Sequence, residues 1–186
     1  SRHSYCWFVT LKDYPDISFT CSVSHDWLAM GSPFIHSDFE EVFCMRALAE
    51  YKENHNLGDD ALSYLHPVNF VYSTEVENLD QLKESYDKML DFINYTSLRY
   101  PILVETDCFG VRMDISGIRL KSSRRNLDGS IDTSIYRQVC NAEKGKLNIT
   151  SFEEICQELE PQLRTHPENP NGFVFVVNST SFVLGS

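Results

Sequence analysis

Basic residues are scarce in this chain of 186 residues. Lysine and arginine together number 16 against 27 aspartates and glutamates, which gives a formal net charge of −11. That balance excludes a protein whose whole surface coats a nucleic acid, because such a protein needs excess cations to neutralise phosphates. Long apolar runs are absent as well. No stretch reaches the roughly 18 consecutive apolar residues that suggest a spanning helix, so we expect no insertion into a membrane.

Signatures of phosphate and metal binding are also missing. The eight glycines are dispersed and form neither a GxGxxG nor a GxxxxGK[ST] pattern, so nothing indicates a nucleotide held by a glycine-rich loop. None of the six cysteines belongs to a CxxC pair, and no two histidines stand four positions apart. We therefore expect neither a cofactor nor a metal site built on these motifs.

The cysteines bear on the compartment. Cys44 lies in an apolar run and Cys156 follows Ile155 on an apolar helical stripe, positions that are typical of buried free thiols. This pattern favours an intracellular protein, cytoplasmic or nuclear. The alternative is a secreted domain whose cysteines form disulfides and which carries N-glycans. Glycosylation motifs occur at Asn94, Asn148 and Asn178.

Strand-like and helix-like patterns follow one another along the whole chain, with no internal repeat and no low-complexity linker. With 42% apolar residues the chain can bury a substantial core. We therefore expect one globular domain over residues 1–186. Because the sequence begins at Ser1, we also expect it to be a fragment of a longer protein.

Three segments have the pattern of a helix. Residue pairs with capping-box spacing, Ser37 with Glu40 and Ser151 with Glu154, predict the starts of two of them. Asn78 is a suitable N-cap for another, whose apolar side chains recur every three or four positions.

Several short segments rich in β-branched and aromatic residues predict strands. They cover residues 6–11, 17–23, 68–72, 101–105, 110–114, 118–121, 135–140 and 173–177. The first two read as a hairpin, the four from 101 to 140 as an antiparallel meander, and the last as a central strand. The sum is an α+β fold in which about three helices pack on a mixed or mainly antiparallel sheet.

Two carboxylates suggest a candidate catalytic site. Glu105 and Asp107 are two positions apart on an expected strand, so their side chains would share a face and could hold a divalent cation together with Asp114. A metal-dependent hydrolase or nuclease would use such a site, although the familiar acid-x-Lys strand signature is not matched. The alternative is a strand end that carries solvated acids.

A second candidate is the apolar segment from Trp27 to Ile35. Trp27, Met30, Phe34 and Ile35 crowd into a stretch that is more apolar than a connecting loop requires. Tryptophan and methionine are common anchors of protein interfaces, so these four residues predict a surface that binds a partner. In the alternative interpretation the segment folds back over the following helix as part of the core.

The charge distribution suggests a third candidate. Residues 112–146 contain eight basic and four acidic side chains, whereas the rest of the chain contains eight basic and 23 acidic ones. This segment could form a basic hairpin that binds an acidic peptide or a phosphate backbone. Its anion-binding residues would be Arg119, Lys121, Arg124, Arg125 and Arg137. The alternative is a solvated hairpin whose charges are offset by the acidic helices.

The interpretation we favour is a non-catalytic protein–protein interaction domain, such as an adaptor, scaffold or assembly module. It requires no catalytic constellation, and the sequence contains none that is well formed. Binding of RNA or another anionic ligand through the segment 112–146 is the alternative. A hydrolase that uses the strand carboxylates is the further alternative.

Overall fold

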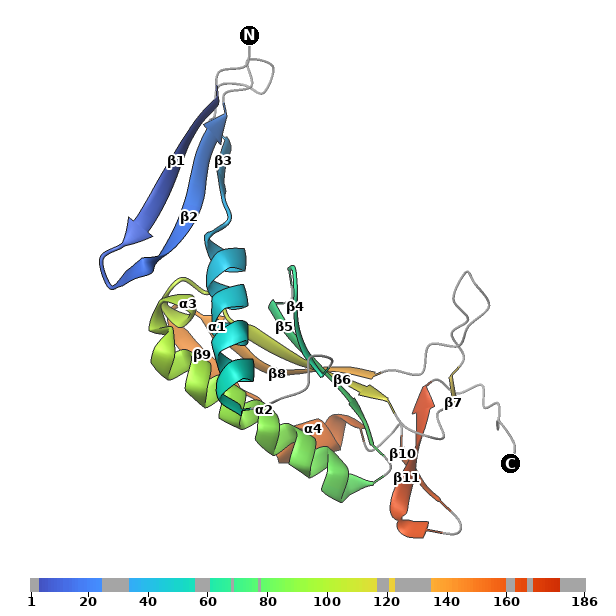
Figure 1. The fold of residues 1–186 in the computed structure, drawn as a ribbon. Helices are drawn as coiled ribbons and strands as arrows, with labels where there is room; N and C mark the ends of the chain where they lie inside the picture. Colours follow the sequence, from blue (N-terminus) through green and yellow to red (C-terminus); the bar gives the residue numbers. More distant parts are fainter. Residues whose placement is uncertain are drawn as a thin grey trace.

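The computed structural model describes residues 4–24, 34–55, 61–67, 69–76, 78–116, 121–122, 135–159, 163–166 and 169–177. Within these ranges the chain forms four helices and eleven strands, and the strands assemble into three sheets (Figure 1). The α+β class is therefore confirmed. The fold differs from the expectation in having one further helix and in dividing its strands among separate sheets.

The N-terminal sheet consists of β1 (Ser4–Leu11), β2 (Tyr14–Ser24) and β3 (Phe34–Ser37), in that order and all antiparallel. The expected hairpin is confirmed as β1 and β2. This sheet extends beyond the helices, so that much of it is free of the rest of the molecule (Figure 1). Helix α1 (Phe39–His55) follows β3 directly and connects the sheet to the body.

The expected capping box at the start of α1 is wrong, although the helix itself is present. Ser37 belongs to β3, and its hydroxyl accepts a hydrogen bond from the backbone N–H of Phe39 at 3.1 Å. Asp38 precedes the helix instead, and its carboxylate accepts from the backbone N–H of Thr20 in β2. The residue before the helix is thus used to bind the neighbouring strand.

The central sheet contains five strands in the order β4 (Leu62–Leu65), β5 (Asn69–Glu75), β6 (Gly110–Ser116), β8 (Ile135–Glu143) and β9 (Lys146–Ile149). Strands β5 and β6 are parallel and every other neighbouring pair is antiparallel. A parallel pair needs a crossover between its strands. Here α2 (Leu79–Arg99) and α3 (Pro101–Glu105) form that crossover.

The expected strand at residues 101–105 is wrong, because this segment is the helix α3. Proline at the first helical position is favourable, since its missing N–H would have no partner there. Leu103 is fully buried, and its backbone N–H donates to the carbonyl of Tyr100 at 3.0 Å. A short apolar run has the same composition in a buried helical turn and in a buried strand, so the pattern could not separate them.

The third sheet pairs segments that are distant in sequence. Its order is β10 (Leu163–His166), β11 (Asn169–Val177) and β7 (Lys121–Ser122), and β11 runs parallel to β7. The strand expected at residues 173–177 is confirmed as part of β11, which is the middle strand of this separate sheet. Of the strand expected at 118–121, only Lys121 lies within the described residues.

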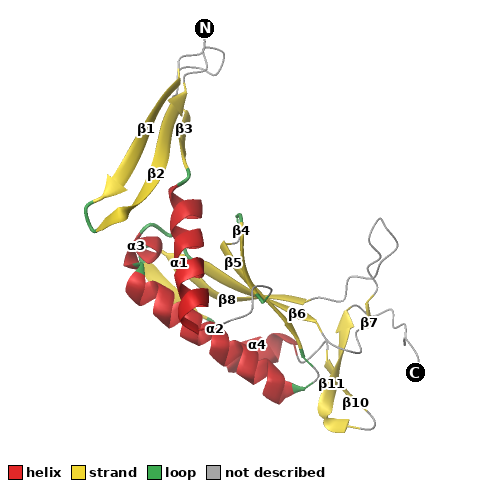
Figure 2. Ribbon diagram, viewed as in Figure 1, coloured by secondary structure: helices red, strands yellow, loops and turns green. Residues whose placement is uncertain are grey.

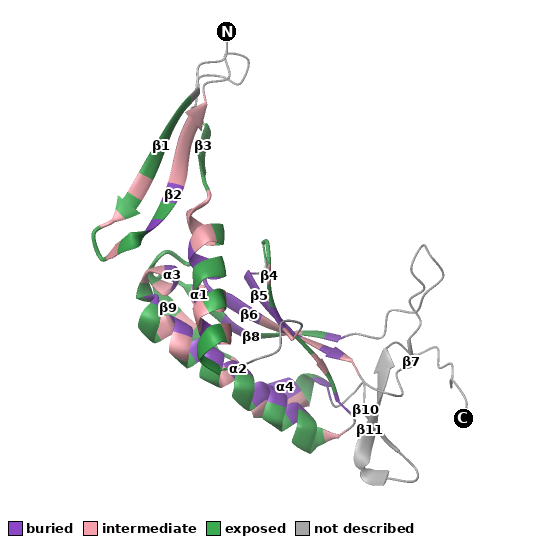
Figure 3. Ribbon diagram, in the orientation of Figure 1, coloured by how far each residue is buried: buried purple, intermediate pink, exposed green. Residues whose placement is uncertain are grey.

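Helices α1, α2 and α4 (Phe152–Leu159) lie on the same side of the central sheet (Figures 1 and 2). Buried residues concentrate between these helices and the sheet (Figure 3). Cys44 and Cys140 are fully buried there, as the sequence predicts for Cys44, whereas Cys156 is only partly buried. All six cysteines lie within the described residues and are free thiols.

Two helix starts follow the sequence signals. The side-chain oxygen of Asn78 accepts from the backbone N–H of Gln81 at 2.9 Å and caps α2. At α4 the capping box is complete, because the backbone N–H of Glu154 donates to the Ser151 hydroxyl at 3.2 Å while that of Ser151 donates to the Glu154 carboxylate at 2.8 Å.

The tight turn between β8 and β9 was not predicted. Lys144 and Gly145 both have positive φ, 54° and 69°, as a type I′ hairpin turn requires. Asp107 stabilises the turn, since its carboxylate accepts from the backbone N–H of Gly145 at 2.9 Å. Asp107, just after α3, thus supports a turn that lies 38 positions later in the sequence and that begins strand β9.

Replacing Lys144 by asparagine is expected to raise the free energy of unfolding by about 0.5–1 kcal/mol, because asparagine adopts the left-handed region more readily than lysine. Urea titration measures this change. The matched substitution Gly145→Ala forces a side chain into the same region and is expected to cost about 1 kcal/mol. Destabilisation by Lys144→Asn would contradict the turn assignment.

Candidate functional site

The end of the N-terminal sheet away from α1 is the strongest candidate site. We call residues 4–8, 20–24 and 34–37 the distal sheet. The register pairs Tyr5 with Val23, Val23 with Ile35, and Phe8 with Thr20. Since directly paired residues share a face, Tyr5 and Ile35 lie on one face of the distal sheet.

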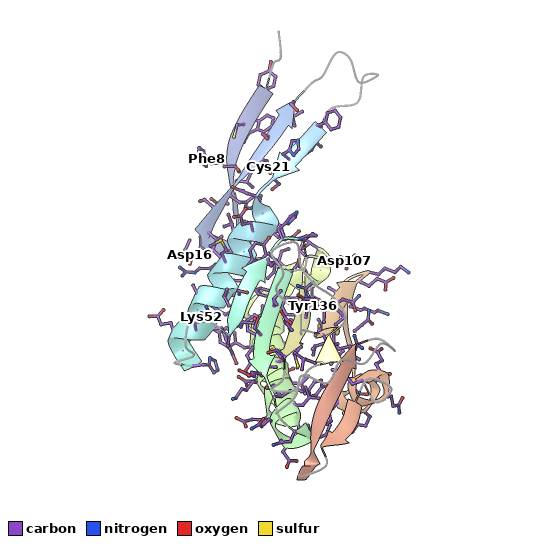
Figure 4. All side chains as sticks on the ribbon, turned by 90° about the vertical axis from the view of Figure 1, so that its right-hand side faces the viewer. Phe8, Asp16, Cys21, Lys52, Asp107 and Tyr136 are labelled. Carbon is purple, nitrogen blue, oxygen red and sulfur yellow. The ribbon has the colours of Figure 1, made fainter. Side chains whose placement is uncertain are left out.

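The register also assigns the remaining large side chains. Trp7 pairs with Cys21 and lies on the face of Tyr5, whereas Phe8 and Phe34 lie on the opposite face. Phe8 and Cys21, which the register assigns to opposite faces, are labelled in Figure 4. The rings of Tyr5 and Trp7 stack with their centroids 6.3 Å apart. Both faces of the distal sheet therefore carry aromatic residues.

Only the other half of this sheet is packed. Near α1, Phe19 is almost fully buried, and its ring lies 5.2 Å from that of Phe39. The distal sheet has no such cover from the described residues. Its large apolar side chains are half or more exposed: Tyr5 by 59%, Trp7 by 50%, Phe8 by 83%, Phe34 by 50% and Ile35 by 71%. These are five of the eleven exposed large hydrophobic residues among the residues described.

Charge is absent from this surface. None of the fourteen residues of the distal sheet is a lysine, arginine, aspartate or glutamate. The charged residues of the hairpin lie at its other end, where Asp16 forms an ion pair with Arg46 of α1 at 3.4 Å. An exposed apolar patch without charge is the usual property of a surface that another molecule covers.

The structure places part of the predicted partner-binding segment in this surface. Phe34 and Ile35 belong to β3 and pair with β2, so this part of the segment does not fold over α1. Trp27 and Met30 lie outside the described residues. Tyr5, Trp7 and Phe8 were missed as site residues, although the uncharged run from Ser4 to Leu11 was a signal that could have identified them.

The carboxylate hypothesis loses its geometric basis. Glu105 ends helix α3, and Asp107 follows it in a turn with a φ of 57°, so the two do not share a strand face. Asp114 lies in β6, a different element. Within the ranges described, no group of three histidine, cysteine, aspartate or glutamate side chains could hold a metal ion. Figure 4 labels Asp107 for comparison.

Strands β6 and β8 pair antiparallel, but the basic hairpin expected between residues 112 and 146 is not confirmed, because Lys121 between them lies in β7 of a different sheet. Arg119, Arg124 and Arg125 lie outside the described residues, and Lys121 is described only through the pairing of β7 with β11. Arg137 lies on β8, where its Nε is 3.2 Å from a carboxylate oxygen of Glu158 in α4. Its side chain is 19% exposed, so it stabilises the packing of α4.

The guanidinium of Arg112 lies on β6, 4.5 Å from the centroid of the Tyr136 ring, which is labelled in Figure 4. This cation–π contact joins two adjacent strands of the central sheet. Arg112 and Arg137 thus both make interactions within the fold, and they do not form a basic patch together.

A shallow groove of about 590 Å³ lies between α1 and α2. The Tyr51 hydroxyl donates to the Asp91 carboxylate at 2.9 Å, and His55 Nε2 lies 3.4 Å from the same group. Burial, followed by this hydrogen bond, raises the pKa of Tyr51. Lys88 on the rim pairs with Glu84 at 2.8 Å. These side chains thus form hydrogen bonds and ion pairs with one another, and we interpret the groove as the contact between the two helices.

Comparison with models of known protein families, with curated proteins and with solved structures found no match to this chain. Among the described residues, no helix is both long and apolar enough to cross a membrane. Among the described residues, the distal sheet is the surface whose geometry and chemistry best fit a binding site.

Proposed function

We propose that this chain is a protein–protein interaction domain that binds partner proteins through the distal sheet. A single observation carries the proposal. Fourteen uncharged residues, on a sheet that extends beyond the helices, hold five large apolar side chains that are half or more exposed (Figures 1 and 3). Most exposed apolar residues of monomeric proteins are scattered singly, whereas a cluster of this kind marks an interface.

The chemistry favours a protein over other ligands. Tyrosine and tryptophan bury a large area on binding and anchor many protein interfaces, and Trp7 and Tyr5 already stack on one another. A nucleic acid would have to approach a chain with a net charge of −11 at a surface without cations. A role as an adaptor or assembly module requires only this binding surface.

Photo-crosslinking in cells tests the proposal. A photoreactive phenylalanine analogue at Phe8 is expected to give covalent adducts with another polypeptide, because this side chain is 83% exposed within the proposed interface. Leu98 on α2 is the matched control, since it is also 83% exposed but lies outside the distal sheet. Mass spectrometry of the adducts identifies the partner.

Equal yields of adduct at Phe8 and Leu98, or no adduct at Phe8, would overturn the proposal. A second readout checks the surface. Phe34→Ala is expected to reduce the yield at Phe8 while leaving the thermal unfolding temperature nearly unchanged, because Phe34 lies on the face of Phe8, is half exposed and is outside the core.

A further inference from the structure

No described strand pairs with the outer edge of β1. Among the described strands β1 pairs only with β2, so one row of its backbone N–H and C=O groups faces outward. With eight residues it is the longest edge strand of the three described sheets. The other edges, β3, β4, β7, β9 and β10, have four residues or fewer.

The sequence of β1 does nothing to protect this edge. Monomeric proteins usually block an edge strand with a charged side chain, a proline, a bulge or a covering segment. Residues 4–11 contain no charge and no proline, and the register irregularity of the hairpin lies only at its end, between Thr10 and Leu11. Aromatic and β-branched residues favour an additional strand at this position.

We propose that a second copy of this chain pairs its β1 with this edge, antiparallel about a two-fold axis, and forms a continuous six-stranded sheet. The inference rests on the proposed function, since it names a partner for the distal sheet. A two-fold axis perpendicular to a sheet keeps each side chain on its own face. An axis at Trp7 therefore pairs Tyr5 with Val9 of the second copy and Cys6 with Phe8 of the second copy.

The distribution of charge over the chain favours a second copy in the antiparallel orientation. The net charge of −11 lies entirely outside the distal sheet, so two copies that associate through this surface bring no like charges into contact there. Antiparallel pairing places the helices of the two copies at opposite ends of the joined sheet, roughly 25 Å apart along strands of this length. That separation exceeds the screening length of about 8 Å at physiological salt. Parallel pairing would bring the helices side by side.

Sedimentation equilibrium of the purified protein over a wide concentration range tests the inference. We expect a reversible dimer whose dissociation constant rises by about tenfold or more in Phe8→Lys and in Cys6→Glu, because each places a charge opposite an apolar side chain. Both side chains are exposed, so circular dichroism is expected to show intact folding. Leu98→Lys is the control and is expected to dimerise like the parent chain.

The orientation has its own test. In the proposed register Cys6 of one copy faces Phe8 of the other, so an equimolar mixture of Cys6→Glu and Phe8→Lys is expected to recover association through an opposite-charge pair. Failure of the mixture to associate would overturn this register.

A parent chain that stays monomeric at every concentration would overturn the self-association. If Phe8 then still gives crosslinks to a different polypeptide in cells, the proposed function stands and only this inference fails. If neither dimer nor crosslink is found, both fail.

Discussion

Replacing Phe43 by alanine is expected to lower the free energy of unfolding by about 3–5 kcal/mol. Phe43 in α1 is fully buried, with ring centroids 4.7 Å from Phe39, 5.2 Å from Tyr14, 6.2 Å from Phe19 and 6.4 Å from Tyr100. These neighbours belong to β2, to α1 itself and to the junction of α2 and α3. Truncation would leave a cavity at the point where the N-terminal sheet joins the body.

Urea unfolding measures the loss, and hydrogen exchange locates it. Since Tyr14 and Phe19 hold the sheet onto Phe43, amides of β1 and β2 are expected to exchange faster in the variant, with a smaller change in β5 and β6. Leu98→Ala on the exposed face of α2 is the control and is expected to stay within about 0.5 kcal/mol of the parent. A loss below about 1 kcal/mol for Phe43→Ala would contradict this packing.

Raising the pH above about 9 is expected to destabilise the protein strongly. Burial raises the pKa of the Cys140 thiol from its ordinary value of 9.0 to about 12. Burial also raises the pKa of Cys44, and the nearby Glu40 and Cys108 add to the effect. The folded state therefore favours neutral thiols, whereas the unfolded chain releases these protons near pH 9.

Because the thiol pKa values are raised in the folded state, the free energy of unfolding is expected to fall as the pH rises. The stability contributed by the neutral thiols is fully present below about pH 9 and is lost as the pH rises toward about 12. One unit of pKa difference corresponds to about 1.4 kcal/mol, so the loss at high pH is on the order of a few kcal/mol. The pKa of Tyr100 is also raised by burial and acts in the same direction.

Urea titrations at a series of alkaline pH values check this prediction. Cys140→Ala removes one of the two fully buried thiols, so the variant is expected to lose less stability over the same pH range. A free energy of unfolding that stays constant from about pH 9 to 12, or an unchanged slope in Cys140→Ala, would show that the thiols ionise freely in the folded state.

The sequence predicts best the features that depend on neighbouring residues. The cap at Asn78, the box of Ser151 and Glu154, and the first hairpin all involve residues that are close in sequence. The failures at Ser37 and at residues 101–105 have the opposite cause. There, contacts with Thr20 of β2 and with the core around Leu103 decide the local structure.

The periodicity of the sequence could not predict the division into three sheets either, because the pairing of strands also depends on residues that are distant in sequence. A strand pattern gives the two faces of a strand but not its neighbours, and β11 pairs with β7 across 55 positions (Val176 with Lys121). The candidate site was predicted only in part. The crowding of apolar residues identifies Phe34 and Ile35, whereas the pattern of β1 is that of an ordinary strand and carries no sign of its unpaired edge.

The parallel pair at the centre of the molecule has a kinetic consequence. Phe70 in β5 pairs with Val111 in β6, about 40 positions later, so this ladder must close a long loop that contains α2 and α3. The loop between β1 and β2 is far shorter, with Thr10 opposite Ser18. Local hairpins form within microseconds, whereas distant pairings are slow because they must first close a long loop. During folding, the N-terminal hairpin is thus expected to precede the central sheet.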